Sequence, residues 1–291
     1  MTDYVAPKEL LQEAVQLAKK KSDLPVRDML IRGALAGAFL GYATSLVFMV
    51  SSQGLAPIVG AILFPVGFVI LALLGLELVT GNFALLPAGL IAKTLNLSKL
   101  LRNLGWVYLG NLIGSLLYAV LFYLAVTSWR TGNGGVMSDL LKQAAQKKTL
   151  AYAALGASGW GTAVVKAVLC NWMVTIGALL ALVSRSTVGK VAAMWLPIMT
   201  FFALGFEHSV VNMFLIPSGM LFGAPISIGQ FLLWNLIPVT LGNFVAGALF
   251  TGIPLYTTYP LEQTQMATSA PAAIAAESEP QTAFARAAGV H

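Results

Sequence analysis

Long apolar runs separated by short polar clusters form most of the chain. About 20 residues of helix, at about 1.5 Å per residue, cross the hydrocarbon core of a bilayer. Six segments approach or exceed that length: 33–50, 58–91, 104–126, 163–183, 192–221 and 228–253. The second and fifth are too long for a simple span, and each contains proline, glycine and a carboxylate. The pattern predicts an all-α membrane protein with six transmembrane helices, the second and fifth interrupted.

Polar segments flank this 33–255 domain on both sides. Within residues 1–32, the spacing of Leu10, Leu11, Val15 and Leu17 predicts an amphipathic helix over about 7–30 on the cytoplasmic membrane surface. Residues 257–291 are rich in Ala, Thr, Ser, Glu and Pro, which predicts a disordered cytoplasmic tail.

Composition excludes an ordinary soluble domain. The chain is 58% hydrophobic and only 10% charged, with a mean hydropathy of +0.81, whereas soluble domains carry about 25% charged residues. The net charge of +6 does not predict a nucleic-acid partner, because the basic residues form short clusters between apolar runs. The expected surroundings are membrane lipid. The single cysteine, Cys170, excludes an intrachain disulfide.

Lysine and arginine predict the orientation. With six crossings, twelve of them share the side of the termini: Lys8, Lys19, Lys20, Lys21, Arg27, Arg32, Lys93, Lys99, Arg102, Arg185, Lys190 and Arg286. The opposite side holds four: Arg130, Lys142, Lys147 and Lys148. Basic residues concentrate on cytoplasmic loops, so both termini are expected in the cytoplasm, most simply at a plasma membrane.

An internal repeat relates the two interrupted segments. Residues 75–89 and 205–219 both follow the pattern G-x-E-x4-N-x4-P-x-G. Gly110-Asn111 also recurs as Gly242-Asn243. The alternative, coincidence in low-complexity sequence, is disfavoured because the shared residues are Glu, Asn, Pro and Gly. Each copy holds three spans (about 33–127 and 161–253), and three is odd, so the second copy must be inverted. Inverted repeats with broken helices indicate a substrate site near the bilayer midplane.

Each break leaves backbone groups without helical partners, which hydrocarbon tolerates only inside protein or beside a cavity. Glu77, Asn82, Glu207 and Asn212 are therefore predicted to support the breaks by hydrogen-bonding freed N–H and C=O groups. The alternative is that the glutamates handle substrate directly. A fixed negative charge in an anion pathway is a penalty, which favours the structural role.

Two titratable residues are candidates for a pathway. His208 lies in the second break and is either a satisfied core histidine or a group that exchanges a proton near neutral pH. Lys166 begins the fourth span and is either an interfacial lysine or a charge that attracts anions. Asn171 is five residues further on and is not on the same line of the helix.

Apolar and hydroxyl side chains accompany the breaks. Thr80 offers a hydroxyl in the first break, although such threonines often bond their own backbone. Phe64, Phe68 and Phe201 precede the breaks and serve either packing or a hydrophobic constriction.

These motifs resemble the formate/nitrite transporter family over about residues 7–255. Residues 205–217 are similar to its fifth-helix signature, 169–172 to its fourth-helix signature and 77–82 to its second-helix break. The resemblance implies an aquaporin-like fold assembled as a homopentamer with one pore per subunit. It also implies site residues: a central histidine at His208, the loop threonine Thr80, the pair Lys166 and Asn171, and constrictions at Phe64, Phe68, Leu78, Val79 and Phe201.

Family members carry formate, nitrite, hydrosulfide, lactate, acetate or bicarbonate. We expect a passive or proton-coupled pathway for a small monovalent anion, formate first and nitrite second, with His208 as the group that would exchange the proton. The alternative of a water or neutral-solute pore is opposed by His208 and by the absence of Asn-Pro-Ala boxes. An enzyme is disfavoured because no nucleophile–base constellation is visible, and neither a metal nor a cofactor is expected.

Overall fold

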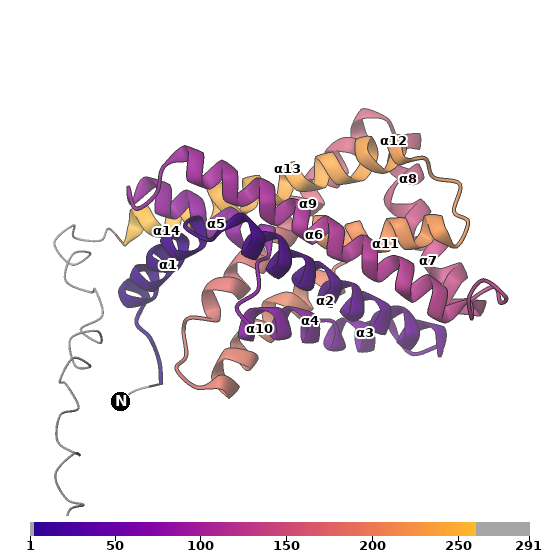
Figure 1. Cartoon of the computed structure of the whole chain (residues 1–291), viewed down its shortest axis with the longest axis horizontal. Coiled ribbons are helices and arrows are strands. Elements are labelled where there is room, and N and C mark those ends of the chain that lie inside the picture. Colours follow the sequence, from indigo (N-terminus) through magenta and orange to yellow (C-terminus); the bar gives the residue numbers. More distant parts are fainter. Residues whose placement is uncertain (1–2, 260–291) are drawn as a thin grey trace, which may run out of the picture. The chain divides into compact units, whose positions relative to one another are not determined.

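The computed structural model describes residues 3–259, and these residues form helices without a β-strand. Most of the predicted tail, 257–291, lies outside the described residues. The helices are α1 (Pro7–Ser22), α2 (Val26–Ser52), α3 (Pro57–Leu63), α4 (Pro65–Leu73), α5 (Val79–Ile91), α6 (Leu97–Val126), α7 (Gly135–Lys148), α8 (Leu150–Ala154), α9 (Ala157–Leu180), α10 (Thr187–Ala203), α11 (Ser209–Leu221), α12 (Ile228–Phe231), α13 (Ile237–Val245) and α14 (Ile253–Thr258), with π-helices η1 (Leu232–Leu236) and η2 (Ala246–Gly252). Figure 1 shows their arrangement.

Four helices in the described chain are long and apolar enough to cross a membrane: α2, α6, α9 and the continuous stretch Ile228–Thr258. Small residues allow them to pack closely. A Cβ on Gly114 of α6 would lie 1.7 Å from the Ala34 carbonyl oxygen of α2, so these two backbones are in direct contact. Close backbone approach at small residues is typical of helix association in lipid, where no hydrophobic force drives it.

Two further helix pairs are interrupted where the sequence predicts. The chain leaves helical geometry between α4 and α5 at Gly75 (φ +63°) and between α10 and α11 at Gly205 (φ +66°). Both glycines adopt left-handed backbone that strains other residues. The first pair also breaks before Pro65, where the carbonyl of Ile62 accepts a hydrogen bond of 2.9 Å from the Trp195 indole.

Amphipathic helix α1 packs against α5, the second helix of the first broken pair, and α7 packs against α11, the second helix of the other pair. The N-terminal helix ends at Ser22 rather than near residue 30, because Pro25 cannot continue a helix and instead precedes the first turn of α2. Ala18 of α1 contacts Gly89 of α5, and Ala145 of α7 contacts Gly219 of α11. The connection between α6 and α9 thus holds a counterpart of α1.

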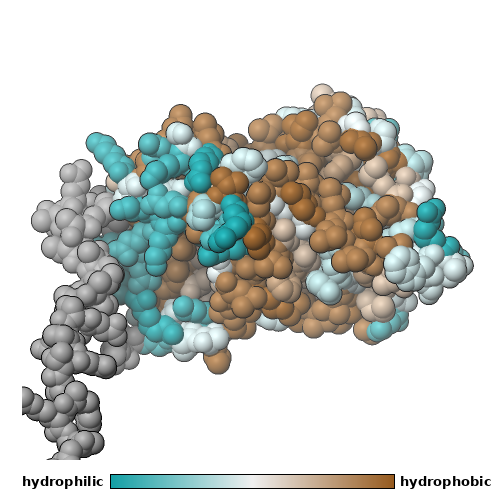
Figure 2. Space-filling model, viewed as in Figure 1, coloured by the Kyte–Doolittle hydropathy of each residue, from teal (hydrophilic) through white to brown (hydrophobic). Residues whose placement is uncertain are grey.

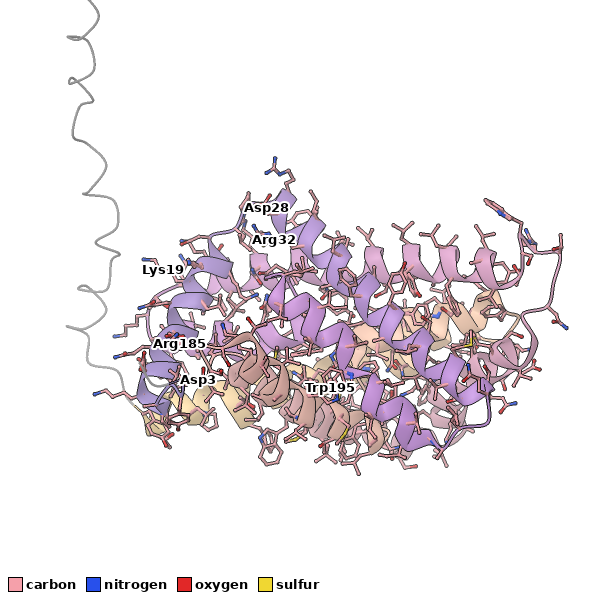
Figure 3. All side chains as sticks on the ribbon, turned by 90° about the horizontal axis from the view of Figure 1, so that it is seen from below. Asp3, Lys19, Asp28, Arg32, Arg185 and Trp195 are labelled. Carbon is pink, nitrogen blue, oxygen red and sulfur yellow. The ribbon has the colours of Figure 1, made fainter. Side chains whose placement is uncertain are left out.

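The polar surface gathers at the end of the molecule that carries α1. Figure 2 shows a hydrophilic region there and a broad hydrophobic surface over the neighbouring helices. Asp3 and Arg185 lie together at this end (Figure 3). The Asp3 carboxylate accepts hydrogen bonds from the backbone N–H groups of Ser186 and Arg185 and from the hydroxyl of Ser184. The Ser186 N–H, with these other donors, holds the pKa of Asp3 below its ordinary value.

Candidate functional site

A buried carboxylate at the first break belongs to a hydrogen-bond network of four residues. Glu77 is 2% exposed, and its oxygens accept hydrogen bonds from the Lys21 ammonium of α1 at 2.7 Å and from the Asn82 amide of α5 at 2.9 Å. Asn82 also donates to Asn103 of α6, and Asn103 donates to the carbonyl of Lys21. We call Lys21, Glu77, Asn82 and Asn103 the α1-side network.

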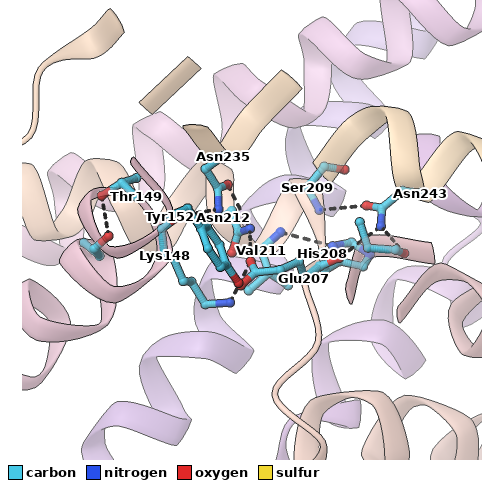
Figure 4. A network of polar contacts seen from close by, with 12 residues as sticks. Lys148, Thr149, Tyr152, Glu207, His208, Ser209, Val211, Asn212, Asn235 and Asn243 are labelled. Carbon is cyan, nitrogen blue, oxygen red and sulfur yellow. Dashed lines mark hydrogen bonds and ion pairs between the residues drawn. The ribbon is translucent and has the colours of Figure 1, made fainter. Parts of the chain in front are cut away.

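The second break carries a matching arrangement, which Figure 4 shows. Glu207 is also 2% exposed and accepts from Lys148 of α7 and Asn212 of α11, each at 2.8 Å. Asn212 donates to Asn235, and Asn235 donates to the carbonyl of Lys148. The Tyr152 hydroxyl adds a further donor to Glu207, at 2.8 Å. We call these five residues the α7-side network.

The backbone of each break is supported by a second asparagine. Asn111 of α6 donates to the carbonyls of Gly33 and Glu77 and accepts from the Val79 N–H that opens α5. Asn243 of α13 repeats this pattern with Ala167, Glu207 and Ser209. The glutamates were expected to accept from loop N–H groups; among the described residues they bind side-chain donors instead. The freed N–H groups go to Asn111 and Asn243, whose amides offer both a donor and an acceptor.

His208 and Thr80 join the two breaks at the centre of the site. His208 precedes the first turn of α11, Thr80 lies in the first turn of α5, and both are buried. The His208 Nε2 lies 3.1 Å from the Thr80 hydroxyl, and its Nδ1 accepts from the Val211 N–H at 3.2 Å. Because Nδ1 acts as an acceptor, a neutral imidazole carries its proton on Nε2 and donates it towards Thr80.

Asn171 of α9 completes this centre. Its amide nitrogen donates to the carbonyl of Thr80 at 3.1 Å and to that of Asn243 at 2.7 Å. Both acceptors are carbonyls, which fixes the amide orientation. The buried Asn171 oxygen has no partner among the described residues. It is an acceptor that a water molecule or a protonated substrate can satisfy.

The five predicted constriction residues are all buried, at 5% exposure or less. Phe201 stacks on the His208 ring with centroids 5.7 Å apart and meets Phe64 edge-on at 5.8 Å. Phe68 and Leu78 line a cavity that also reaches α1. Val79 opens α5 beside Thr80. Apolar side chains thus surround the polar centre.

A cavity of about 540 Å³ leads from the α1 end towards Leu78 and Phe68. We call it the α1 vestibule. Its polar lining includes Lys20, Lys21, Arg32, Lys190 and Glu77. Positive side chains therefore outnumber the one carboxylate in the wall.

Lys166 makes no side-chain hydrogen bond with His208 or Thr80 among the described residues. It is half-buried on α9, and its ammonium lies 5.9 Å from the centre of the Tyr152 ring. Its carbonyl accepts a 3.4 Å hydrogen bond from the Glu207 N–H. The structure therefore brings Thr80, His208 and Asn171 together and places Lys166 beside the α7-side network. No group of three metal-ligating side chains occurs within residues 3–259.

The sequence reasoning missed Lys21, Lys148, Tyr152, Asn103 and Asn235. A signal for the lysines existed: Lys-Lys-Ser at 20–22 recurs as Lys-Lys-Thr at 147–149, each ahead of a repeat. Asn103 likewise precedes Asn111 by the eight residues that separate Asn235 from Asn243. Nothing in the sequence pointed to Tyr152.

Comparison with known proteins decides the family. The pattern of the formate/nitrite transporter family matches residues 8–257. The chain belongs to the formate/nitrite transporter family. A probable formate transporter of Methanothermobacter thermautotrophicus is 34% identical over 282 residues, covering 89% of this chain and 98% of the relative. The formate channel FocA of Escherichia coli (strain K12) is 30% identical over 250 residues, covering 77% and 84%.

Solved structures share the fold. An ion channel of this family superposes with a TM-score of 0.70 at 25% identity, covering 87% of this chain and 98% of that one. A pentameric formate channel with formate bound gives a TM-score of 0.66 at 24% identity, covering 80% and 97%. The chain is thus an integral membrane protein of a family of channels and transporters rather than enzymes.

Proposed function

We propose that this protein conducts a small monovalent anion, formate first and nitrite second, through a pore centred on His208 and Thr80. The observation that carries the proposal is the 3.1 Å contact between their side chains, which joins the two broken helices inside apolar surroundings. Relatives described as formate transporters or channels support the choice of formate. Hydrosulfide, lactate and bicarbonate remain outcomes of the substrate test.

The proposed architecture is six spans in two inverted repeats, within domains 1–32, 33–255 and 257–291. The matched carboxylate networks support it: Lys21 corresponds to Lys148, Glu77 to Glu207, and Asn111 to Asn243. Coincidence does not account for such agreement in both sequence order and hydrogen-bond partners. In this proposed architecture α1 lies at one mouth of the pore and α7 at the other.

The proposed pathway begins with electrostatic attraction. Lysine and arginine side chains of the α1 vestibule raise the local anion concentration, and Lys166, half-buried beside Tyr152, is assigned the same role on the α7 side. The anion then meets Leu78, Phe68 and Phe201, where losing its water costs several kcal/mol unless it is neutralised or hydrogen-bonded. A weak acid avoids much of that cost by crossing with a proton.

His208 is the proposed proton donor, and its geometry sets a condition on that role. Adding a second proton requires Nδ1 to release the Val211 N–H. Proton donation is therefore linked to a loosening of the first turn of α11. When the ring is neutral, its Nε2–H and the Thr80 hydroxyl are the two donors that can hydrogen-bond a substrate oxygen.

We further propose that both termini face the cytoplasm of a plasma membrane and that the protein forms a homopentamer with one pore per subunit. The excess of lysine and arginine on the α1 side supports the orientation. The TM-score of 0.66 to a pentameric channel supports the assembly through a shared fold.

The test is flux in proteoliposomes that contain the purified protein. Formate, nitrite, hydrosulfide, lactate and bicarbonate are compared at several pH values, with glycerol as an uncharged probe. We expect formate to move fastest and its rate to rise as the pH falls. Glycerol flux equal to formate flux, with no pH dependence, would replace this proposal with a neutral-solute pore.

A further inference from the structure

We propose that the α1 vestibule is a binding site for a polyvalent phosphate anion, which blocks the transport pathway from that side. The inference rests on the proposed function for its effect on flux, but not for the binding itself. The cavity has a volume of about 540 Å³. Pockets of 300–1,000 Å³ hold ligands far larger than a three-heavy-atom anion.

The positive side chains that line the vestibule favour a ligand with more than one negative charge. Lys21 is paired with Glu77 at 2.7 Å, and Arg32 has Asp28 at 3.8 Å. Lys20 and Lys190 also line the vestibule, and neither has an ion pair among the described residues. Two positive side chains, one from α1 and one from α10, are thus left facing one cavity. A dianion can neutralise both at once, whereas a monovalent anion leaves one uncompensated.

The residue types favour phosphate. Lysine binds phosphate as a compact point charge with rotatable donors, and Arg32 adds a planar group that matches a phosphate edge. Lys20 and Lys190 lie on separate helices, so a ligand with two phosphoryl groups can reach both. Pyrophosphate is the simplest molecule with this chemistry.

Such an anion cannot follow the transported substrate inward. The inner wall of the vestibule is apolar at Phe68 and Leu78. One proton neutralises formate but leaves pyrophosphate with charge, so its desolvation cost at the constriction stays large. The ligand therefore stays in the vestibule and obstructs it. Its affinity should fall with salt, because exposed charges are screened.

Pyrophosphate is the probe in two measurements. Calorimetric binding to the purified protein tests the site, and formate flux into phosphatidylcholine vesicles, with pyrophosphate on one face at a time, tests the block. We expect saturable binding and inhibition from the α1 face. In the double variant Lys20→Ala/Lys190→Ala both constants should weaken by about tenfold or more, or about 1.4 kcal/mol. Inhibition is scored against each variant's own uninhibited rate.

Lys19→Ala is the matched control, because Lys19 is an exposed neighbour that does not line the vestibule. It should keep wild-type inhibition. Absence of pyrophosphate binding, equal inhibition from both faces, or equal weakening in Lys19→Ala would overturn the proposal. If pyrophosphate binds but the protein does not conduct formate, the binding site is retained and the proposed transport substrate is wrong. If vesicles of anionic phospholipid alone slow the wild type and not the double variant, the phosphate belongs to lipid and the soluble ligand is wrong.

Discussion

Two carboxylates are buried in the described part of this membrane protein, and a buried charge is unfavourable unless it has a partner. Glu77 and Glu207 are each 2% exposed, and each is bound by a lysine and an asparagine. A buried ion pair adds little net stability relative to apolar residues, but removing one partner leaves a charge without compensation. The networks therefore position the break more than they stabilise the fold.

Lys148→Met tests this account. It should lower the free energy of unfolding by about 3 to 5 kcal/mol, because Glu207 loses its cationic partner. The double variant Lys148→Met/Glu207→Gln should recover part of the loss, since no charge is then buried. Thermal unfolding in detergent measures both. Lys166→Met is the control, because Lys166 makes no ion pair among the described residues. This variant should be as stable as the wild type, and it should lose anion flux more than flux of uncharged solutes. A double variant no more stable than Lys148→Met would contradict the ion-pair argument.

His208→Asn separates a proton-exchanging histidine from a capping one. The asparagine oxygen can replace Nδ1 as the acceptor of the Val211 N–H, so folding should be retained, although the shorter side chain does not reach the Nε2 position beside Thr80. The titratable ring is lost, so formate uptake should lose its pH dependence. Vesicle uptake over a pH series measures this, with circular dichroism as the folding control. An unchanged rate and pH profile would leave His208 only a cap for α11.

At the scale of elements, each broken helix depends on one glycine with left-handed backbone. Gly205 has φ +66°, and a Cβ added there would meet no atom within 4 Å. The obstacle to another residue is therefore backbone conformation rather than space.

Gly205→Ala should destabilise the protein by about 1 to 2 kcal/mol, which is the cost of a left-handed non-glycine residue. Gly105→Ala is the control: it lies inside α6, also meets no atom, and carries no left-handed φ. Alanine there should be neutral or slightly stabilising. Thermal unfolding midpoints compare the two. Equal losses in both variants would show that crowding, not φ, is responsible.

The N-terminal segment is attached to the α9–α10 loop by charged contacts. Asp3 accepts from Ser184, Arg185 and Ser186, and Arg185 pairs with Glu9 and Glu13. These contacts are exposed, so they orient the segment more than they add stability.

Acid should release this segment. The pKa of folded Asp3 is below its unfolded value of about 3.9, so its contribution is present above that pH and is lost as the pH falls through the folded pKa. Protection of the backbone around residues 3–9 from hydrogen exchange, measured relative to the intrinsic exchange rate at each pH, should therefore fall at acid pH. Asp3→Asn should show faster exchange already at neutral pH, whereas Asp139→Asn, on α7, should not. Identical exchange in Asp3→Asn and wild type would remove Asp3 from the attachment.

At the scale of the whole molecule, the two halves share a plan. A surface helix, a buried carboxylate network and a broken helix recur in the same order, ending at α6 and at the Ile228–Thr258 stretch. The central pair Thr80–His208 takes one residue from each half, so neither half alone builds it.

Single cysteines should report the proposed orientation. The native Cys170 is fully buried and gives little background. Lys93→Cys should react with an impermeant thiol reagent only from the cytoplasmic side, and Arg130→Cys only from the opposite side. Right-side-out and inverted vesicles provide the two faces. Labelling of both positions from one face would refute an odd number of spans between them.

The sequence by itself determined the class, the family and the breaks. Hydrophobic run length predicts spans because bilayer thickness is fixed, and the repeated G-x-E-x4-N-x4-P-x-G pattern locates both interruptions. His208 and Thr80 were singled out because polar residues in long apolar segments require a reason, and Asn171 through the resemblance to the family; their role in transport stays a prediction. These inferences use local properties of the chain.

Only the tertiary structure decided which partners those residues have. Lys21 is 56 residues from Glu77 and Lys148 is 59 from Glu207, so no local pattern pairs them. The structure was also needed to show that Asn111 and Asn243, not the glutamates, bind the freed backbone groups of each break. A carboxylate only accepts hydrogen bonds, whereas an amide can bridge a carbonyl and an N–H. The position of Lys166 beside Tyr152 and the basic α1 vestibule likewise follow from helices that meet only in the folded chain.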